Sequence, residues 1–215
     1  MGALIYLVKT KLPEYIGTSP FEIQVLTPMR KGELGVEHLN EVLQYYLNPA
    51  SESKKEKEGR TGVFREGDKV MQVKNNYKLE WKITNAKGFS VEEGLGVFNG
   101  DMGVIKQINT YSERITVVFD ENREVEYPYS NLDELELAYA ITIHKSQGSE
   151  YPAVVLPLLS GPPILCNRNL LYTAITRAQK CAAIVGRQSM VEQMIHNETE
   201  QKRYSGLNEC LKDGI

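Results

Sequence analysis

The sequence lacks the features that mark secreted, membrane or metal-binding proteins. No apolar run approaches the roughly 20 residues that span a bilayer, and the run at 3–8 (ALIYLV) is too short for a signal peptide. The three cysteines, Cys166, Cys181 and Cys210, are widely spaced, and no CxxC pair occurs. This spacing predicts reduced thiols rather than disulfides or a zinc site. We therefore expect a cytoplasmic protein with no membrane segment and no bound metal.

Complete catalytic motifs are also missing. No Gly-Lys dipeptide occurs in the 215 residues, so the phosphate-binding pattern G-x-x-x-x-G-K-[ST] is absent. There is no G-x-S-x-G, and the three histidines show no accompanying nucleophile pattern. The segment 115–121 (ITVVFDE) has the form of a Mg²⁺-binding strand, but NREVEY follows at once, which indicates the turn of a β-hairpin. Neither a complete nucleotide hydrolase nor a Ser-His-Asp hydrolase is predicted.

Charge is unevenly distributed along the chain. The net charge is −3, which excludes general adhesion of a polycation to nucleic acid. Residues 141–190 nevertheless carry a net +4, whereas residues 121–137 carry a net −5. A local cationic surface on an acidic protein indicates a defined anion site.

The pattern of predicted helices and strands changes twice along the sequence. Residues 21–28 (FEIQVLTP) predict a strand and 34–47 an amphipathic helix, which together form one βα unit. The charged segment 48–60 predicts an exposed or disordered linker. Between 62 and 135, short β segments separated by turn signals predict a small barrel or curled sheet.

From residue 137 onward, predicted strands again alternate with a predicted helix. We expect strands at 137–143, 153–159 and 181–186, with a helix at 168–180. The fold class is therefore α/β with an inserted β module. The expected division is an α/β domain formed by residues 1–61 and 136–215, interrupted by a β module at 62–135.

Two segments could hold an anion. The loop 144–150 (HKSQGSE) interrupts a strand pattern, and backbone N–H groups near Gly148 together with Lys145 could line a phosphate. A solvated turn is the alternative. On the helix predicted at 168–180, Thr173, Arg177 and Lys180 would form one polar stripe. Arg177 could instead only favour the helix dipole.

The order of these segments resembles the C-terminal half of a superfamily 1 helicase of the RecD type, the exodeoxyribonuclease V alpha-subunit family. The resemblance covers about residues 21–187. The family's motif IV is similar to VLTPMRKGELGVEHLNEVLQ, and its SH3-like insertion is similar to FREGDKVMQVKNNY and VFNGDMGVI. Motif V is similar to AYAITIHKSQGSEYPAVVLPL, and motif VI is similar to RNLLYTAITRAQKCAAIVG.

The resemblance implies a RecA-like motor domain, the second of two, with an inserted SH3-like β-barrel. The P-loop belongs to the family's first motor domain and is missing here, so we expect this chain to be part of a longer protein. ATP and Mg²⁺ would be bound mainly by that N-terminal P-loop domain. The chain alone is expected to hydrolyse no ATP.

The resemblance also implies roles for individual residues. Arg177 would be the arginine finger and Arg30 a second cation at the nucleotide, with Gly148 and Glu150 beside it. Single-stranded DNA would be held by polar side chains of the motif V likeness and of the insertion: Thr142, His144, Lys145, Ser146, Asn75 and Asn76.

By family, translocation would run 5′ to 3′ in DNA recombination and repair, with other nuclease-helicase subunits as possible partners. Two alternatives stay open. The chain could be a stand-alone module whose barrel binds single-stranded nucleic acid or a protein partner without any motor. It could also be an interaction subunit that keeps motifs V and VI only as relics. Within the insertion, a purely structural role for Gln72, Asn75 and Asn76 also stays open.

Overall fold

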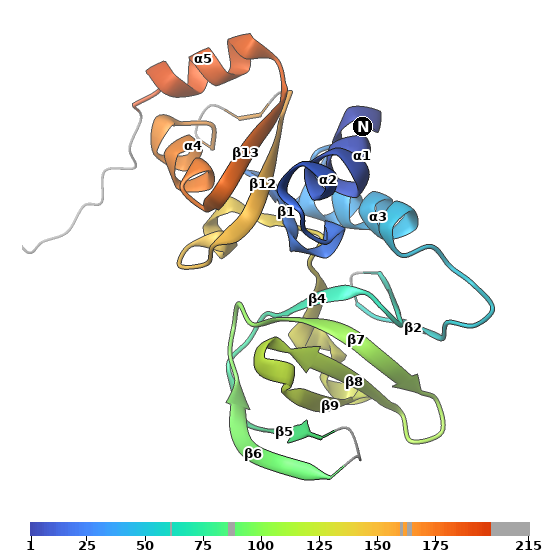
Figure 1. The fold of residues 1–215 in the computed structure, drawn as a ribbon. Helices are drawn as coiled ribbons and strands as arrows, with labels where there is room; N and C mark the ends of the chain where they lie inside the picture. Colours follow the sequence, from blue (N-terminus) through green and yellow to red (C-terminus); the bar gives the residue numbers. More distant parts are fainter. Residues whose placement is uncertain (61, 86–88, 160, 163–164, 199–215) are drawn as a thin grey trace, which may run out of the picture.

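The described residues fold into two main sheets, one above the other in Figure 1, and a short two-stranded pair. The structure is a computed structural model that describes residues 1–60, 62–85, 89–159, 161–162 and 165–198. A four-stranded parallel sheet carries the helices, and a seven-stranded antiparallel sheet curls beneath it. The chain enters the second sheet after the helix at Val36–Leu47 and returns to the first at Ala140. The predicted α/β class with an inserted β unit is confirmed.

The parallel sheet has the strand order β11-β1-β12-β13. The residues of β1, β11 and β12 are largely buried, as expected for strands covered on both faces, whereas the edge strand β13 has no buried residue. Register pairs Val25 with both Ala140 and Val155, which fixes β1 between its neighbours. The strands are β1 (Ile23–Thr27), β11 (Ala140–Thr142), β12 (Tyr151–Leu158) and β13 (Ala178–Gly186).

Alternate residues of the sheet enter two different cores. Val25 and Val155 pack with the N-terminal helical segment and α3, and that core continues into the antiparallel sheet. Leu26 and Val154 face α4 and α5 on the other side. The helical elements are α1 (Gly2–Tyr6), a π-helix (Leu7–Lys11), α2 (Leu12–Ile16), α3 (Val36–Leu47), α4 (Arg168–Ile175) and α5 (Gln188–His196). In the described ranges, no helix combines the length and hydropathy needed to cross a membrane.

The antiparallel sheet has the order β10-β4-β7-β8-β9-β5-β6. The hairpin predicted at 115–121 is confirmed, because β8 and β9 pair across Asp120–Asn122. The strands are β4 (Lys69–Gln72), β5 (Asn76–Thr84), β6 (Ser90–Val97), β7 (Met102–Asn109), β8 (Arg114–Phe119), β9 (Glu124–Pro128) and β10 (Leu135–Leu137), and a separate pair is formed by β2 (Glu56–Glu58) and β3 (Val63–Arg65).

Three predicted elements are wrong in detail. The strand expected at 137–143 is split: Leu137 ends β10, and Ala140 begins β11 in the other sheet. The helix expected at 168–180 ends at Ile175, because β13 begins at Ala178 to pair with β12. The linker expected at 48–60 contains β2, and its first residue, Asn48, is buried. Residues 199–215 of the expected α/β domain, with Cys210, lie outside the described residues.

A buried carboxylate joins the two sheets. Asp68, at the start of β4, is fully buried and accepts four hydrogen bonds of 2.6–2.9 Å. Two donors, Gln44 Nε2 and Asn48 Nδ2, come from α3 and the residue that follows it. Arg65 N and Tyr139 OH supply the other two. Burial raises the pKa of Asp68, and these hydrogen bonds oppose the shift.

Lys69 forms a second buried connection. Its Nζ donates to Phe21 O at 2.7 Å and to Gln24 Oε1 at 2.8 Å, and the residue is only 7% exposed. Gln24 Nε2 in turn donates to Ala138 O and Tyr139 O, where the chain returns to the parallel sheet. Burial of the ammonium group lowers the pKa of Lys69 to about 8.

Asp68→Ala should lower the free energy of unfolding by about 3 kcal/mol, because buried amide and hydroxyl donors lose their acceptor. Urea denaturation followed by circular dichroism measures the change. The matched control is Glu126→Ala, which removes an exposed carboxylate of the same unit. Equal, small losses in both variants would contradict the role of Asp68.

The free energy of unfolding should rise as pH increases from 8 toward 9.5, through the contribution of Lys69. Its folded pKa of about 8 lies below the ordinary 10.5, so the unfolded chain binds more protons in this window. The contribution over the full range to 10.5 is at most roughly 3 kcal/mol. Lys69→Met should flatten the rise in urea titrations at pH 7.5 and 9.5. An identical pH dependence in both proteins would refute this account.

Candidate functional site

Arg177 lies against the segment 144–150, although the two are far apart in sequence. It occupies the turn between α4 and β13, and its carbonyl oxygen accepts from Tyr151 N at 2.9 Å. Its half-buried guanidinium donates from Nε to Thr173 O, from Nη1 to Ser149 O and from Nη2 to Thr176 Oγ1, at 3.3, 3.1 and 3.4 Å. None of these acceptors is a carboxylate. Within the described chain the charge of Arg177 is therefore held in place without an ion pair.

The polar stripe expected on the helix does not form. Thr176 closes α4 with ψ near −5°, and Lys180 lies in β13. In the sequence, the helix-like spacing of side chains continues past residue 178. In the structure, pairing of β13 with β12 imposes an extended backbone from Ala178 onward. Arg177 therefore sits in a turn fixed at both ends, and the helix dipole does not explain its position.

The segment beside Arg177 is exposed. Gly148 has φ +88° with open space around its Cβ position, so glycine is required by the backbone conformation and not by a close neighbour. Glu150 is exposed, and its Oε2 accepts from Gln179 Nε2 at 3.3 Å. Arg177, Gly148 and Glu150, which were predicted to share the nucleotide, are thus brought together at the amino ends of β12 and β13.

The first half of the segment is a 3₁₀ turn, Ile143–Ser146. Thr142 Oγ1 accepts from Lys145 N at 3.3 Å and caps this turn. Ser146 is fully buried, and its Oγ donates to Ile143 O at 2.7 Å. The hydroxyl of Ser146 therefore serves the turn, which does not fit the DNA contact expected for it.

The expected cradle of backbone N–H groups is largely occupied within the segment. The N–H groups of Gln147 and Ser149 donate to His144 O and Ser146 O, and that of Lys145 to Thr142. Recognition of an anion here must depend mainly on side chains, and those of His144 and Gln147 are exposed.

Arg30 and Lys145 share one carboxylate. They follow the carboxyl ends of β1 and β11, which are neighbours in the parallel sheet. Arg30 Nη2 lies 3.0 Å from Glu136 Oε1, and Lys145 Nζ lies 3.0 Å from Glu136 Oε2. Burial acts to raise the pKa of Glu136, but the hydrogen bonds from Arg30 and Lys145 outweigh it and lower the pKa.

A hollow of about 520 Å³ separates the turn after β11 from the antiparallel sheet. His144 and Lys145 line one side, and Asp101 of the β6–β7 connection lines the other and lies 3.7 Å from Arg123. The remaining lining residues are Met71, Asn99, Gly100, Gln147 and Ser149. The hollow is mostly polar and joins the two sheets.

The insertion residues predicted to bind DNA divide into two kinds. Asn75 Oδ1 accepts from Asn99 N at 2.9 Å, which places Asn75 beside a residue of the hollow. Asn76 Nδ2 donates to both carboxylate oxygens of Glu134. Gln72 is fully buried and also donates to Glu134. A purely structural role therefore fits Gln72 and Asn76 better than it fits Asn75.

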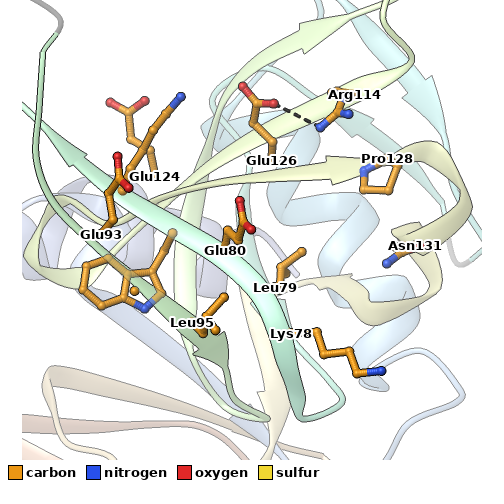
Figure 2. Close-up of a pocket in the computed structure, with 13 residues that line it drawn as sticks. Lys78, Leu79, Glu80, Glu93, Leu95, Arg114, Glu124, Glu126, Pro128 and Asn131 are labelled. Atoms are coloured by element: carbon orange, nitrogen blue, oxygen red, sulfur yellow. Dashed lines mark hydrogen bonds and ion pairs between the residues drawn. The ribbon is translucent and has the colours of Figure 1, made fainter.

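A larger groove of about 700 Å³ lies in the antiparallel sheet over Trp81 (Figure 2). Figure 2 shows Glu80, Glu93, Glu124 and Glu126 around it. Four carboxylates against three cations do not suit a phosphate backbone. Its volume therefore does not make it the nucleic-acid site.

Glu136 and Asp101 were missed as site residues by sequence reasoning. Both belong to acidic or turn segments, and no motif links either to the cations that they face. Glu136 lies near Lys145 only because β10, in the antiparallel sheet, is followed directly by β11, in the parallel sheet. Over the residues that the structure describes, no cluster of three or more His, Cys, Asp or Glu side chains is arranged to hold a metal ion.

Two family models match the chain. Residues 39–119 match the SH3 domain of ATP-dependent RecD-like DNA helicases, and residues 137–185 match the UvrD-like helicase C-terminal domain. The fold and the site thus define the C-terminal domain of a helicase with an SH3-like insertion.

Curated relatives agree with this class. The ATP-dependent RecD2 DNA helicase of Deinococcus radiodurans is 40% identical over 160 residues, which cover 74% of this chain and 19% of that protein. The RecBCD enzyme subunit RecD of Mycolicibacterium smegmatis is 30% identical over 191 residues, covering 89% of this chain and 29% of that protein.

Among solved structures, a Bacteroides Pif1 helicase crystallised with ADP-AlF3 and ssDNA is similar with a TM-score of 0.49 at 19% identity, covering 88% of this chain and 46% of that one.

The chain corresponds to the C-terminal part of a RecD-type helicase. It spans less than a third of the length of either RecD relative described above.

Proposed function

We propose that this chain is the second motor domain of an ATP-driven DNA helicase and supplies its arginine finger. The observation that carries the proposal is Arg177, a guanidinium fixed by two carbonyls and a hydroxyl and without a carboxylate partner in the described chain. A cation held in this way is preorganised for an anion that arrives from outside the chain.

The chemistry of Arg177 fits a transferring phosphoryl group. A guanidinium has five N–H donors in a planar fork, and the three hydrogen bonds described use one donor on each nitrogen. Two donors of the permanently charged fork are then available for phosphate oxygens. The phosphate would be presented by the N-terminal P-loop domain, which would also hold most of the ATP and Mg²⁺. The chain alone would not hydrolyse ATP.

The remaining nucleotide contacts follow from the same surface. Glu150 is exposed and can accept a hydrogen bond from a ribose hydroxyl, and Gly148 leaves open space beside it. We do not carry Arg30 forward as a nucleotide contact, because it follows the carboxyl end of β1, at the edge of the parallel sheet opposite the amino ends of β12 and β13 where Arg177 lies. Its guanidinium is about half exposed, so an anion at that other edge can reach it.

Single-stranded DNA would pass through the hollow between the two sheets. His144 and Lys145 would face phosphates from one wall, with Thr142 fixing their turn and Asn75 supporting the opposite wall. Such contacts are independent of base sequence and weaken with salt. We do not carry Ser146 or Asn76 forward as DNA contacts, because their side chains serve the turn and Glu134.

In the whole protein, closure of the motor domains on ATP would move the strand by one step. Movement would run 5′ to 3′ in DNA recombination or repair, in the cytoplasm, alone or with other nuclease-helicase subunits. We further propose that residues 1–61 and 136–215 form the motor domain and residues 62–135 the inserted module that guides the strand.

In the intact helicase that contains this chain, Arg177→Ala should lower the rate of ATP turnover by roughly 10³–10⁵. Nucleotide binding should change little, because the finger acts on charge that develops in the transition state. Steady-state ATPase assays and binding of a fluorescent ATP analogue measure the two quantities.

The matched control is Arg187→Ala, an exposed arginine at the start of α5, which should leave turnover unchanged. Arg177→Lys should not restore turnover, since an ammonium cannot reproduce the fork. A parallel loss of turnover and nucleotide binding in Arg177→Ala would show that the residue is structural.

Lys145→Ala should weaken binding of single-stranded DNA and reduce the slope of log affinity against log salt by about 0.7, the value of one phosphate contact. Fluorescence anisotropy of a labelled oligonucleotide with the 215-residue chain measures both. The control is Lys106→Ala, in the antiparallel sheet beside Glu124. DNA binding that survives changes at both His144 and Lys145 would favour a stand-alone binding module in place of a motor domain.

A further inference from the structure

Glu136 lies where the chain leaves one sheet for the other. It is the central residue of β10, opposite Met71 of β4, and only Ala138 and Tyr139 separate β10 from β11. Its side chain is 22% exposed and stands between Arg30 and Lys145, with one oxygen toward each. The carboxylate therefore belongs to the antiparallel sheet, whereas both cations belong to the parallel sheet.

The backbone that follows Glu136 is fixed by buried hydrogen bonds. Asn40 Nδ2 donates to Leu137 O and Ala140 O, and Asn40 Oδ1 accepts from Ala140 N, all at 2.8–3.0 Å. Ala138 N donates to Lys69 O at 2.9 Å. Because this backbone is fixed, the carboxylate can follow a cation that moves toward a ligand only within the reach of its own side chain.

We propose that Glu136 is a shared counter-ion that restrains Arg30 and Lys145 in the ligand-free protein and couples them. The inference rests on the proposed function, in which Lys145 faces a DNA phosphate, while Arg30, half exposed at the same edge of the parallel sheet, is open to a second anion. Each ligand must draw its cation away from the same carboxylate.

A single carboxylate between two cations makes their states interdependent. When one cation leaves for an anion, the full negative charge of Glu136 acts on the other, which is then held more tightly. Anions bound at Arg30 and at Lys145 therefore affect each other through Glu136, and linkage requires the effect to be equal in both directions.

The test uses binding of a fluorescein-labelled oligothymidylate to the 215-residue chain. Glu136→Gln removes the charge and keeps the size of the side chain, so Lys145 is released and DNA affinity should rise roughly two- to fivefold, the range of a partly exposed ion pair. The gain should disappear in the double variant with Lys145→Ala. An affinity that is unchanged or lower in Glu136→Gln would overturn the proposal.

Glu126→Gln is the matched control. Figure 2 shows Glu126 paired with Arg114 at the groove of the antiparallel sheet, where the same change of net charge occurs away from Lys145. It should leave DNA affinity within twofold of the unaltered chain. An equal gain in both glutamine variants would mean that only net charge matters, which contradicts a local restraint.

Coupling is tested through Arg30→Met. Without Arg30, Glu136 holds Lys145 more tightly, so DNA affinity should fall, and the fall should vanish in the Glu136→Gln background. A fall that persists there would show Arg30 acting without Glu136 and would overturn the coupling. If Lys145→Ala alone leaves affinity unchanged, the proposed DNA contact itself fails, and the inference fails with it.

Discussion

The arrangement of this protein depends on one buried carboxylate. Asp68 collects donors from α3, from β3 and from the return crossing at Tyr139. A buried carboxylate must have its hydrogen bonds satisfied, so these three segments cannot separate from Asp68 without a large cost. The apolar core supports the same connection, since residues of both sheets belong to one cluster. The inserted β unit is therefore held at a fixed angle to the parallel sheet, and the hollow between them has fixed walls.

Two kinds of cation lie at opposite edges of the parallel sheet, and they are prepared differently for anions. Arg177 is positioned by neutral oxygens and keeps its charge uncompensated in the described chain. Arg30 and Lys145 are compensated by Glu136 before any ligand arrives. A neutral cradle favours tight, rigid recognition of an incoming charge, whereas a counter-ion makes recognition competitive. The first suits catalysis and the second suits a contact that must be made and released at each step.

The motifs were a better guide to which segments lie close together than to how each side chain is used. The hydroxyl of Ser146 donates to the nearby Ile143 O, and the amide of Asn76 donates to Glu134, 58 residues further along the chain. Short polar side chains in turns commonly bond to nearby backbone or carboxylate groups, and sequence alone does not show which partner is taken. Arg177 shows the opposite case, since its side chain is long enough to cross from the turn after α4 to the carbonyl of Ser149.

The sequence by itself determined the alternation of α/β and β texture, the hairpin at residues 115–128 and the family to which the motifs belong. These features are local, because turn chemistry and apolar periodicity act over a few residues. Only the tertiary structure decided where α4 ends, because pairing of β13 with β12 overrides helical spacing. It also decided that Glu136 faces Arg30 and Lys145. Electrostatic partners are set by distance in space, and residues 30, 136 and 145 meet only when the antiparallel sheet returns to the parallel one.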